Sequence, residues 1–315
     1  MWFRNLQLYR VPTNWQMTVE ALNTQLSRYP LRPCTGFEMQ TQGWTAPRAL
    51  PEEIEPSLVY SVAGQFLLQL TVEKKLLPSS VIKQEMEAKA VALENQQGFK
   101  VGRKQMREIK EHVTSDLLPR AFSVRASTKV WINPKTGLLA VDSATPAKAE
   151  LIVALLCKSV PGLPLIRVDT TKSPSSCMTG WLAADEAPQG FSIDQDTELR
   201  ASDDTKATLR LTRQSMAVDE ANNHITQGKQ CVRLAMTWQN RVSFVLGETF
   251  VIKRVAPVDV VTETDSGDDA DERFDADFVM MAGEVTKMTD DLIDALGGEG
   301  GGAAGDLATG EGAPF

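Results

Sequence analysis

Apolar and polar positions alternate over several short stretches of the chain, which is the pattern of a half-buried β-strand. The opening stretch shows it clearly, with Phe3, Leu6 and Leu8 set between polar residues. One later stretch folds at Ala63–Gly64, and two others flank the turn residues Asn-Pro-Lys-Thr-Gly, so both predict β-hairpins. The last three stretches follow one another closely and predict an antiparallel meander. The stretches that predict strands are residues 3–11, 57–72, 129–132, 138–141, 209–214, 231–238, 242–246 and 250–255.

Other stretches repeat their apolar residues every three or four positions, which predicts amphipathic helices. Thr18 is a candidate N-terminal cap for the first of them. Residues 33–47 and 162–203 are broken by Pro and Gly and predict loops and short elements, with Trp44 interpreted as a core side chain. Strands and helices mixed in this way indicate an α+β fold of antiparallel sheets and helices. The predicted helices are residues 18–29, 79–95, 106–117, 146–159, 219–226 and 274–296.

Two of these helices are joined by a basic turn. The turn runs from Gly98 to Lys104, and Pro119 ends the second helix because proline cannot continue it. We therefore predict a projecting helical hairpin whose tip carries cations. Its apolar positions are Ile82, Met86, Val91 and Leu93, with the alanines between them, in the first helix, and Met106, Ile109, Val113 and Leu117 in the second.

Charge is distributed unevenly along the chain. Residues 73–135 hold 13 Lys and Arg against 7 Asp and Glu, a net charge of +6 in a chain whose total is −8. The acidity comes from residues 262–315, which carry −13, so residues 1–261 carry +5. A basic arm on such a body fits a polyanion, of which nucleic acid is the commonest. The alternative is that these cations only solvate two exposed helices.

The composition supports few other kinds of chemistry. No run of about 18 apolar residues and no apolar leader is present, so a cytoplasmic protein without membrane contact is expected. The four cysteines are far apart, and His112 and His224 lie on separate predicted helices, so neither a metal site nor a cofactor is expected. Phosphate-loop and nucleophile-elbow motifs are absent. The acidic run from Asp265 to Glu272 is interpreted as a solvated loop, with a metal-dependent nuclease centre as the alternative.

Shifts in composition divide the chain into five regions. Residues 1–72 form an N-terminal α+β region, and residues 73–127 form the basic hairpin region. Residues 128–261 form an α+β body with antiparallel strands, followed by an acidic loop and a C-terminal helix over residues 262–297. The glycine-rich residues 298–315 are expected to be a disordered tail.

Several longer motifs occur in the order found in one known family. They are MWFRNLQLYR at the start, Gly43–Trp44, LPSSVIKQEMEAK at 77–89, LLPRAFS at 117–123, GLLAVD at 137–142, APQGF at 187–191, NHI at 223–225 and RFDADFVMMAGE at 273–284. Over about residues 1–298 the chain resembles the recombination-associated protein RdgC family of proteobacteria. The glycine-rich extension departs from the family pattern, and no function is assigned to it.

The resemblance implies a ring-shaped homodimer with a positively lined hole, which encircles double-stranded DNA without regard to sequence. Such a protein has no catalytic activity, is associated with the nucleoid, and limits RecA-dependent recombination and fork repair by occupying DNA. Phe122 matches the aromatic residue that packs at the dimer contact and acts as the gate of the ring, and Arg120 matches the arginine beside it. Arg213 and Gln214 match a basic-Gln pair that faces the hole. The alternative for Phe122 is an ordinary core phenylalanine.

Phosphate contacts from such cations would give binding that is salt-sensitive and tolerant of sequence. Phe99 and Gly102 stand where some relatives are more basic, so the tip differs in detail. A second hypothesis is a regulator that contacts RecA or a replication protein directly through its acidic segment, and salt dependence separates the two. The residues expected to contact DNA are Lys100, Arg103, Lys104, Arg120, Arg213 and Gln214.

Overall fold

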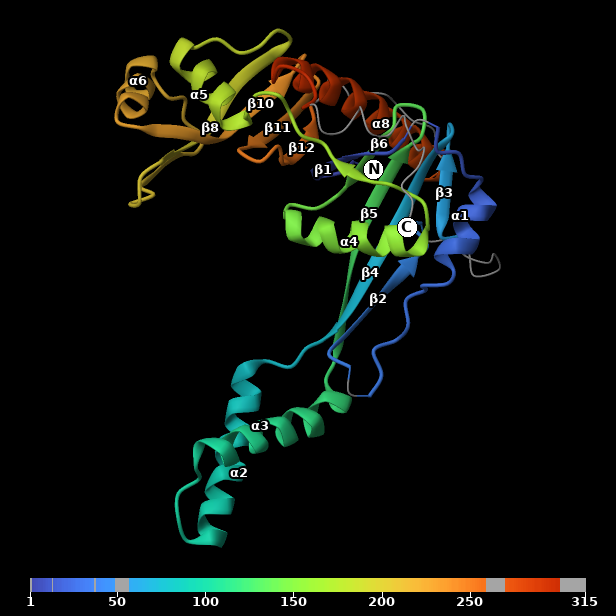
Figure 1. The fold of residues 1–315 in the computed structure, drawn as a ribbon, viewed down its shortest axis with the longest axis vertical. Coiled ribbons are helices and arrows are strands. Elements are labelled where there is room, and N and C mark those ends of the chain that lie inside the picture. The colour runs from blue at the N-terminus through green and yellow to red at the C-terminus, as the bar shows by residue number, and fades with distance from the viewer. Residues whose placement is uncertain (1, 13, 37, 49–56, 259–269, 301–315) are drawn as a thin grey trace, which may run out of the picture.

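The computed structural model describes residues 2–12, 14–36, 38–48, 57–258 and 270–300, and it confirms the α+β class (Figure 1). Its strands are β1 (Asn5–Arg10), β2 (Gln40–Thr45), β3 (Val59–Val62), β4 (Gln65–Lys75), β5 (Ser123–Asn133), β6 (Leu138–Val141), β7 (Ile166–Arg167), β8 (Phe191–Ala201), β9 (Thr208–Leu211), β10 (Lys229–Trp238), β11 (Val242–Gly247) and β12 (Ile252–Pro257). Its helices are α1 (Val19–Leu26), α2 (Ser79–Gln97), α3 (Arg103–Leu117), the 3-10 turn η1 (Leu118–Arg120), α4 (Pro146–Ser159), α5 (Pro174–Ala184), α6 (Val218–Thr226) and α8 (Ala270–Ala295).

Within the described residues, the body is built on one twelve-stranded antiparallel sheet. The strand order is β2-β4-β5-β6-β1-β12-β11-β10-β8-β9, with β3 beside β4 and β7 beside β1. β1 joins the two halves of this sheet, because Asn5 and Leu6 pair with β12 while Gln7 to Arg10 pair with β6. The predicted meander is confirmed as β10, β11 and β12, which pair in sequence.

Helices cover both faces of the sheet, and each covered face has its own core. On one face, Met281 of α8 is fully buried in a cluster that contains Trp131 of β5 and Leu246 of β11. Because these strands belong to different halves of the sheet, α8 ties the halves together, and Figure 1 shows it running across them. On the other face, Leu22 of α1 and Leu156 of α4 are fully buried against the β2–β6 half.

The predicted helical hairpin is confirmed as α2 and α3, which project from the body beyond the ends of β4 and β5 (Figure 1). Its core is small, with Ala90, Ile109 and Val113 as the buried residues. The placement of Val91 in this core is wrong, since its side chain is 56% exposed. Ala90, one of the alanines expected on the apolar face, is buried there because it lies one turn after Met86, on the same face of the helix.

The prediction of a loop over residues 33–47 is wrong, because β2 lies within it. Gly43 weakens the strand pattern, but a Cβ at this position would lie 2.2 Å from the backbone nitrogen of Leu31. The absence of a side chain therefore lets a neighbouring segment pair with β2, where the Trp44 amide donates to the Tyr29 carbonyl at 2.9 Å. The interpretation of Trp44 as a core residue is confirmed, since it is 1% exposed.

The prediction of loops and short elements over residues 162–203 holds for the two-residue β7 and the segments around it, and it is wrong for the eleven-residue helix α5 and the eleven-residue strand β8. Pro174 starts α5. Proline is favoured there because the N–H groups of the first turn have no partner within the helix, so the N–H that proline lacks costs no hydrogen bond. Ser173 caps this helix by accepting from the Ser176 amide at 3.1 Å. Residues 265–269 of the acidic run and most of the glycine-rich tail lie outside the described residues, while residues 270 and 271 belong to the start of α8.

Candidate nucleic-acid interface

The turn between α2 and α3 places three exposed cations at the tip of the hairpin: Lys100, Arg103 and Lys104. Among the described residues none forms an ion pair with them. The turn begins at Gly98, whose φ of 79° lies in the left-handed region that glycine adopts without strain. The cations are therefore available to an external anion.

Side-chain hydrogen bonds fix this turn. Glu94 Oε1 accepts from the Val101 amide at 2.9 Å, and Gln105 Oε1 accepts from the Gly102 amide at 3.1 Å. Gln105 Nε2 also donates to Gln97 Oε1 at 3.0 Å, which joins the end of α2 to the start of α3. The amide of Gly102, the N-terminal cap residue of α3, is satisfied in this way, and the bonds across the turn give the tip a defined structure.

Three cations along the sides of the hairpin, Lys83, Lys89 and Arg107, are paired. Lys89 of α2 donates to Asp116 of α3 at 2.6 Å, and this contact lowers the pKa of the Asp116 carboxyl below its usual value. Arg107 lies 3.5 Å from Glu111 on the same helix. Exposed pairs of this kind contribute little to stability. They nonetheless offset much of the positive charge on the sides of the hairpin, where Lys110 is an exposed cation without a pair among the described residues, whereas all three tip cations are unpaired.

The base of the hairpin presents Arg120 and Phe122, where η1 leads into β5. Arg120 is exposed, and Phe122 is 85% exposed, so the interpretation of Phe122 as an ordinary core residue is wrong. The Leu76 amide donates to the Phe122 carbonyl at 2.7 Å. Leu76 is 50% exposed and Val124 is 45% exposed. Large apolar groups left in water in this way are typical of a contact surface.

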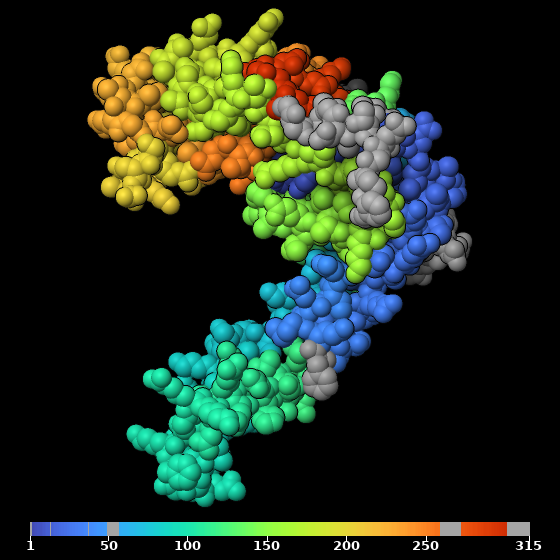
Figure 2. Space-filling model, in the orientation of Figure 1, coloured from blue at the N-terminus to red at the C-terminus, as the bar shows by residue number. Residues whose placement is uncertain are grey.

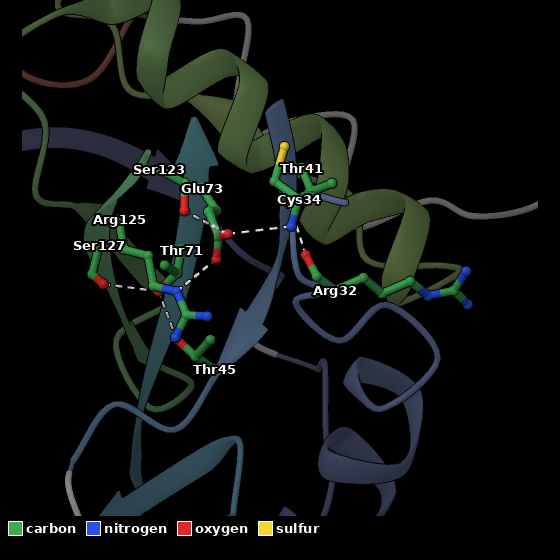
Figure 3. Close-up of polar contacts among 9 residues, drawn as sticks. All are labelled: Arg32, Cys34, Thr41, Thr45, Thr71, Glu73, Ser123, Arg125 and Ser127. Carbon is green, nitrogen blue, oxygen red and sulfur yellow. Dashed lines mark hydrogen bonds and ion pairs between the residues drawn. The ribbon is translucent and has the colours of Figure 1, made fainter. Parts of the chain in front are cut away.

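A polar network holds the hairpin to the body (Figure 3). Glu73 of β4 is 5% exposed, and its carboxylate accepts from Ser123 Oγ at 2.9 Å, Arg125 Nε at 2.7 Å and the Cys34 amide at 3.2 Å. The bond from the Arg125 guanidinium is the largest cause of the lowered pKa of Glu73, and the Ser123 and Cys34 donors add to it.

Arg213 and Gln214 lie beyond the end of β9, and their placement within a strand is wrong. The Arg213 amide donates to Asp196 Oδ1 at 2.9 Å, and the Gln214 amide donates to the Gln195 carbonyl at 3.1 Å. Asp196 Oδ2 accepts from Arg254 at 2.7 Å. The pKa of Asp196 is lowered, first by the Arg213 amide and then by Arg254. Arg213 has a φ of 57°, a strained value for a residue with a side chain, so these contacts hold its loop in a fixed shape.

These candidate residues lie in three places. The tip cations share one turn, Arg120 and Phe122 share the base of the hairpin, and Arg213 with Gln214 belongs to the β8–β9 end of the sheet. Figure 2 shows the hairpin and the β8–β9 end at opposite ends of an arc, with a hollow between them. A single chain therefore does not bring the three groups together.

The sequence reasoning missed features that depend on tertiary contacts. Phe99 lies at the tip beside the cations and is 63% exposed. The sequence did not predict this exposure, because an apolar residue in a turn can be either buried or exposed. Arg233 pairs with Glu198 at 3.2 Å on neighbouring strands, which could be found only from the register of β8 and β10. Glu73, the first residue of the basic region, is buried, which its sequence position does not indicate.

The described residues contain no cluster of three or more His, Cys, Asp or Glu side chains that could hold a metal ion. The acidic run considered for a nuclease lies largely outside them, with only Glu272 exposed at its end. No helix in the part of the chain that the structure describes is long and apolar enough to cross a membrane.

The fold and this surface define a class of protein: an α+β sheet protein with a projecting, cation-tipped helical hairpin. The family model described as "RdgC: Putative exonuclease, RdgC" matches residues 1–299. Relatives named "Recombination-associated protein RdgC" are 52% identical over 301 residues in Janthinobacterium sp. (strain Marseille) and 51% identical over 302 residues in Herminiimonas arsenicoxydans, each covering 95% of this chain and 99% of the relative. A third, from Bordetella pertussis (strain Tohama I), is 48% identical over 301 residues with the same coverage. The chain belongs to the RdgC family, as its motifs predicted.

Proposed function

We propose that this protein is a sequence-independent double-stranded DNA-binding protein that encircles DNA as a dimeric ring and limits RecA-dependent recombination and fork repair. The observation that carries the proposal is the set of unpaired cations at the tip of a hairpin that forms one end of an arc (Figure 2). The names of the relatives connect the family to recombination, whose substrate is DNA.

The chemistry of the candidate contacts favours phosphate over base recognition. Lys and Arg neutralise phosphates and release counterions, whereas sequence is read by side chains that reach the base edges. Arg120 is exposed at the base of the hairpin, and Arg213 is exposed at the far end of the arc with Gln214 as a neutral donor. Each protomer offers five candidate cations, which are Lys100, Arg103, Lys104, Arg120 and Arg213. If every one of them contacted a phosphate, the slope of log K against log salt for a dimer would be about −9, and fewer contacts would make it shallower.

Closure of the ring is assigned to Phe122. An arc with two ends closes when a second copy meets it through a two-fold axis, and an exposed aromatic near one end suits such a contact. Burial of the side chain would contribute about 1.5–3 kcal/mol on each side of the axis. A closed ring dissociates slowly from DNA without ends, so this contact adds to retention and leaves the phosphate contacts unchanged.

The test is a salt titration of binding to closed circular and to short linear duplex DNA, with the wild type and Phe122→Ala. Binding to both DNAs should weaken steeply as salt rises, and Phe122→Ala should shorten the lifetime on the circle more than on the linear duplex. Absent or salt-insensitive DNA binding would overturn the proposal. Salt-insensitive binding to RecA would then support a regulator that acts by direct protein contact.

The proposal describes a protein without catalytic activity, although the family model carries an exonuclease description. End-labelled linear duplex incubated with the protein and Mg²⁺ or Mn²⁺ should remain intact. Cleavage that disappears with a chelator and with Asp268→Asn/Asp269→Asn would replace the ring proposal with a metal-dependent nuclease.

A further inference from the structure

Phe122 is exposed as a side chain, yet its backbone is firmly held. The Leu76 amide donates to the Phe122 carbonyl at 2.7 Å, and Lys75 Nζ donates to the preceding carbonyl, that of Ala121, at 3.3 Å. The next residue, Ser123, donates its hydroxyl to Glu73 at 2.9 Å. Contacts of this kind present the aromatic ring from a fixed backbone.

Glu73 is the centre of these contacts. Its carboxylate accepts three hydrogen bonds, from Ser123, Arg125 and the Cys34 amide, which come from the start of β5 and from the segment before β2 (Figure 3). A charge buried without such partners would be costly, and a charge with three donors is held in one geometry. The carboxylate therefore links β4 and β5 at the point where both strands leave the body.

The neighbouring contacts along this neck are also polar. Thr71 Oγ1 lies 2.8 Å from Ser127 Oγ and 2.7 Å from Thr45 Oγ1, which extends the network across β2, β4 and β5. Thr71 and Glu73 point to the same face of β4, because side chains two positions apart on a strand share a face. These side-chain hydrogen bonds thus add directional contacts to the backbone pairing of β4 and β5 at the neck.

We infer that Glu73 is a positioning residue for the contact made by Phe122: it fixes the start of β5 against β4, and so sets where the aromatic ring meets the second copy of the chain. This inference rests on the proposed role of Phe122 in closing the ring. Arg125 is 63% exposed as a side chain, so the guanidinium has room to move if the carboxylate is changed. Glu73 thus has a positioning role in a basic region whose cations are proposed to contact DNA.

The test is a double-mutant cycle of Glu73→Gln and Phe122→Ala, with the lifetime on closed circular DNA as the readout. Glu73→Gln should shorten that lifetime about tenfold in the wild-type background, which lies within the coupling expected for interacting residues. It should change the lifetime less than about twofold in the Phe122→Ala background. Affinity for a short linear duplex, where closure does not matter, should stay unchanged.

Glu284→Gln is the matched control. Glu284 of α8 is also a buried carboxylate, and it accepts two hydrogen bonds from Arg241 at 2.7 Å. Its replacement should lower thermal stability but leave the lifetime on circles unchanged. If Glu73→Gln does not fold, Ser123→Ala removes only one donor to Glu73 and should give a smaller effect of the same kind.

The outcomes separate the inference from the proposed function. Equal shortening by Glu73→Gln (or by Ser123→Ala) in both backgrounds would mean a merely structural role and would overturn the inference alone. The inference alone would also be overturned if Phe122→Ala clearly shortened the lifetime on circular DNA while neither Glu73→Gln nor Ser123→Ala shortened it. A wild-type lifetime for Phe122→Ala would overturn the proposed gate, and the inference with it.

Discussion

The hairpin and the body are stabilised in different ways. In the body, two large apolar clusters bury whole side chains from strands and helices on both faces of the sheet. In the hairpin, Ala90, Ile109 and Val113 are the buried residues, and hydrogen bonds at the tip and neck supply the remaining order. The hairpin is thus a thin arm whose shape depends on local contacts and on its attachment to the body.

The two regions also treat positive charge differently. Several arginines of the body are paired with acids, as in Arg241 with Glu284 and Arg254 with Asp196. Within the described residues, the tip cations have no such partners. The charge of these body arginines is satisfied inside the fold, whereas the charge at the tip faces solvent. Arginine side chains therefore stabilise the fold at these positions of the body, whereas the arginine and lysine side chains at the tip stay unpaired.

The largest expected effect tests the difference in cores. Ile252→Ala should lower the free energy of unfolding by about 2–5 kcal/mol, because Ile252 is fully buried in β12 next to the joint strand β1. Ile109→Ala should cost less, since Ile109 is 9% exposed and its small cluster can relax. Chemical denaturation measures both changes.

Hydrogen exchange distinguishes local from global loosening in the same two variants. Ile109→Ala should speed exchange in α2 and α3 while leaving β10 to β12 protected, and Ile252→Ala should speed exchange across the sheet. Equal loss of protection throughout the chain in both variants would show that the arm and the body unfold as one unit.

The next effect tests the difference in charge. Replacing Lys100, Arg103 and Lys104 together with Gln should weaken DNA binding and reduce the salt slope by roughly 3 per protomer, because each phosphate contact contributes about 1. Arg241→Gln is the matched control, since its guanidinium is already paired with Glu284. A salt slope that changes equally in both proteins would remove the distinction between paired and unpaired cations.

Periodicity and turn residues were enough to predict most helices and strands. The helical hairpin, the meander and the long C-terminal helix follow from repeated apolar positions that each element satisfies by itself. β2 was missed because Gly43 weakens the strand pattern, although its lack of a side chain is what lets the neighbouring segment pair with β2. α5 was missed because Pro174 was interpreted as a break, whereas it is the first residue of the helix. Both errors concern residues whose role is set by their surroundings.

The candidate site was predictable to a smaller extent. Exposure of the tip cations follows from a basic turn between two helices, and the structure places them there. The fixed loop of Arg213 depends on Asp196, which lies 17 residues away on β8, and the neck depends on Glu73 meeting Arg125 across two strands. Sequence spacing contains no signal for such pairs until the strand register is known.

A smaller effect is expected from pH at the neck. The pKa of Glu73 is lowered from 4.5 in the folded protein, so its contacts stabilise the fold at any pH above that value and this stabilisation is lost as the pH falls through the folded pKa. Wild-type protein should therefore lose more stability on acidification below about pH 4.5 than Glu73→Gln, which has no charge to lose. Denaturant titrations of both proteins between neutral and acidic pH measure the difference, and parallel curves would contradict it.

The smallest effect compares one glycine in each region. Gly98→Ala should destabilise the hairpin by roughly 1 kcal/mol, because its left-handed φ of 79° is strained for any residue with a side chain. Gly283→Ala, in the exposed middle of α8, should instead stabilise the body by about 0.5–1 kcal/mol, because alanine loses less backbone entropy in a helix. A Cβ meets nothing within 4 Å at either position, so packing does not enter the comparison. Changes of the same sign in denaturation experiments would mean that backbone conformation is not what distinguishes these two sites.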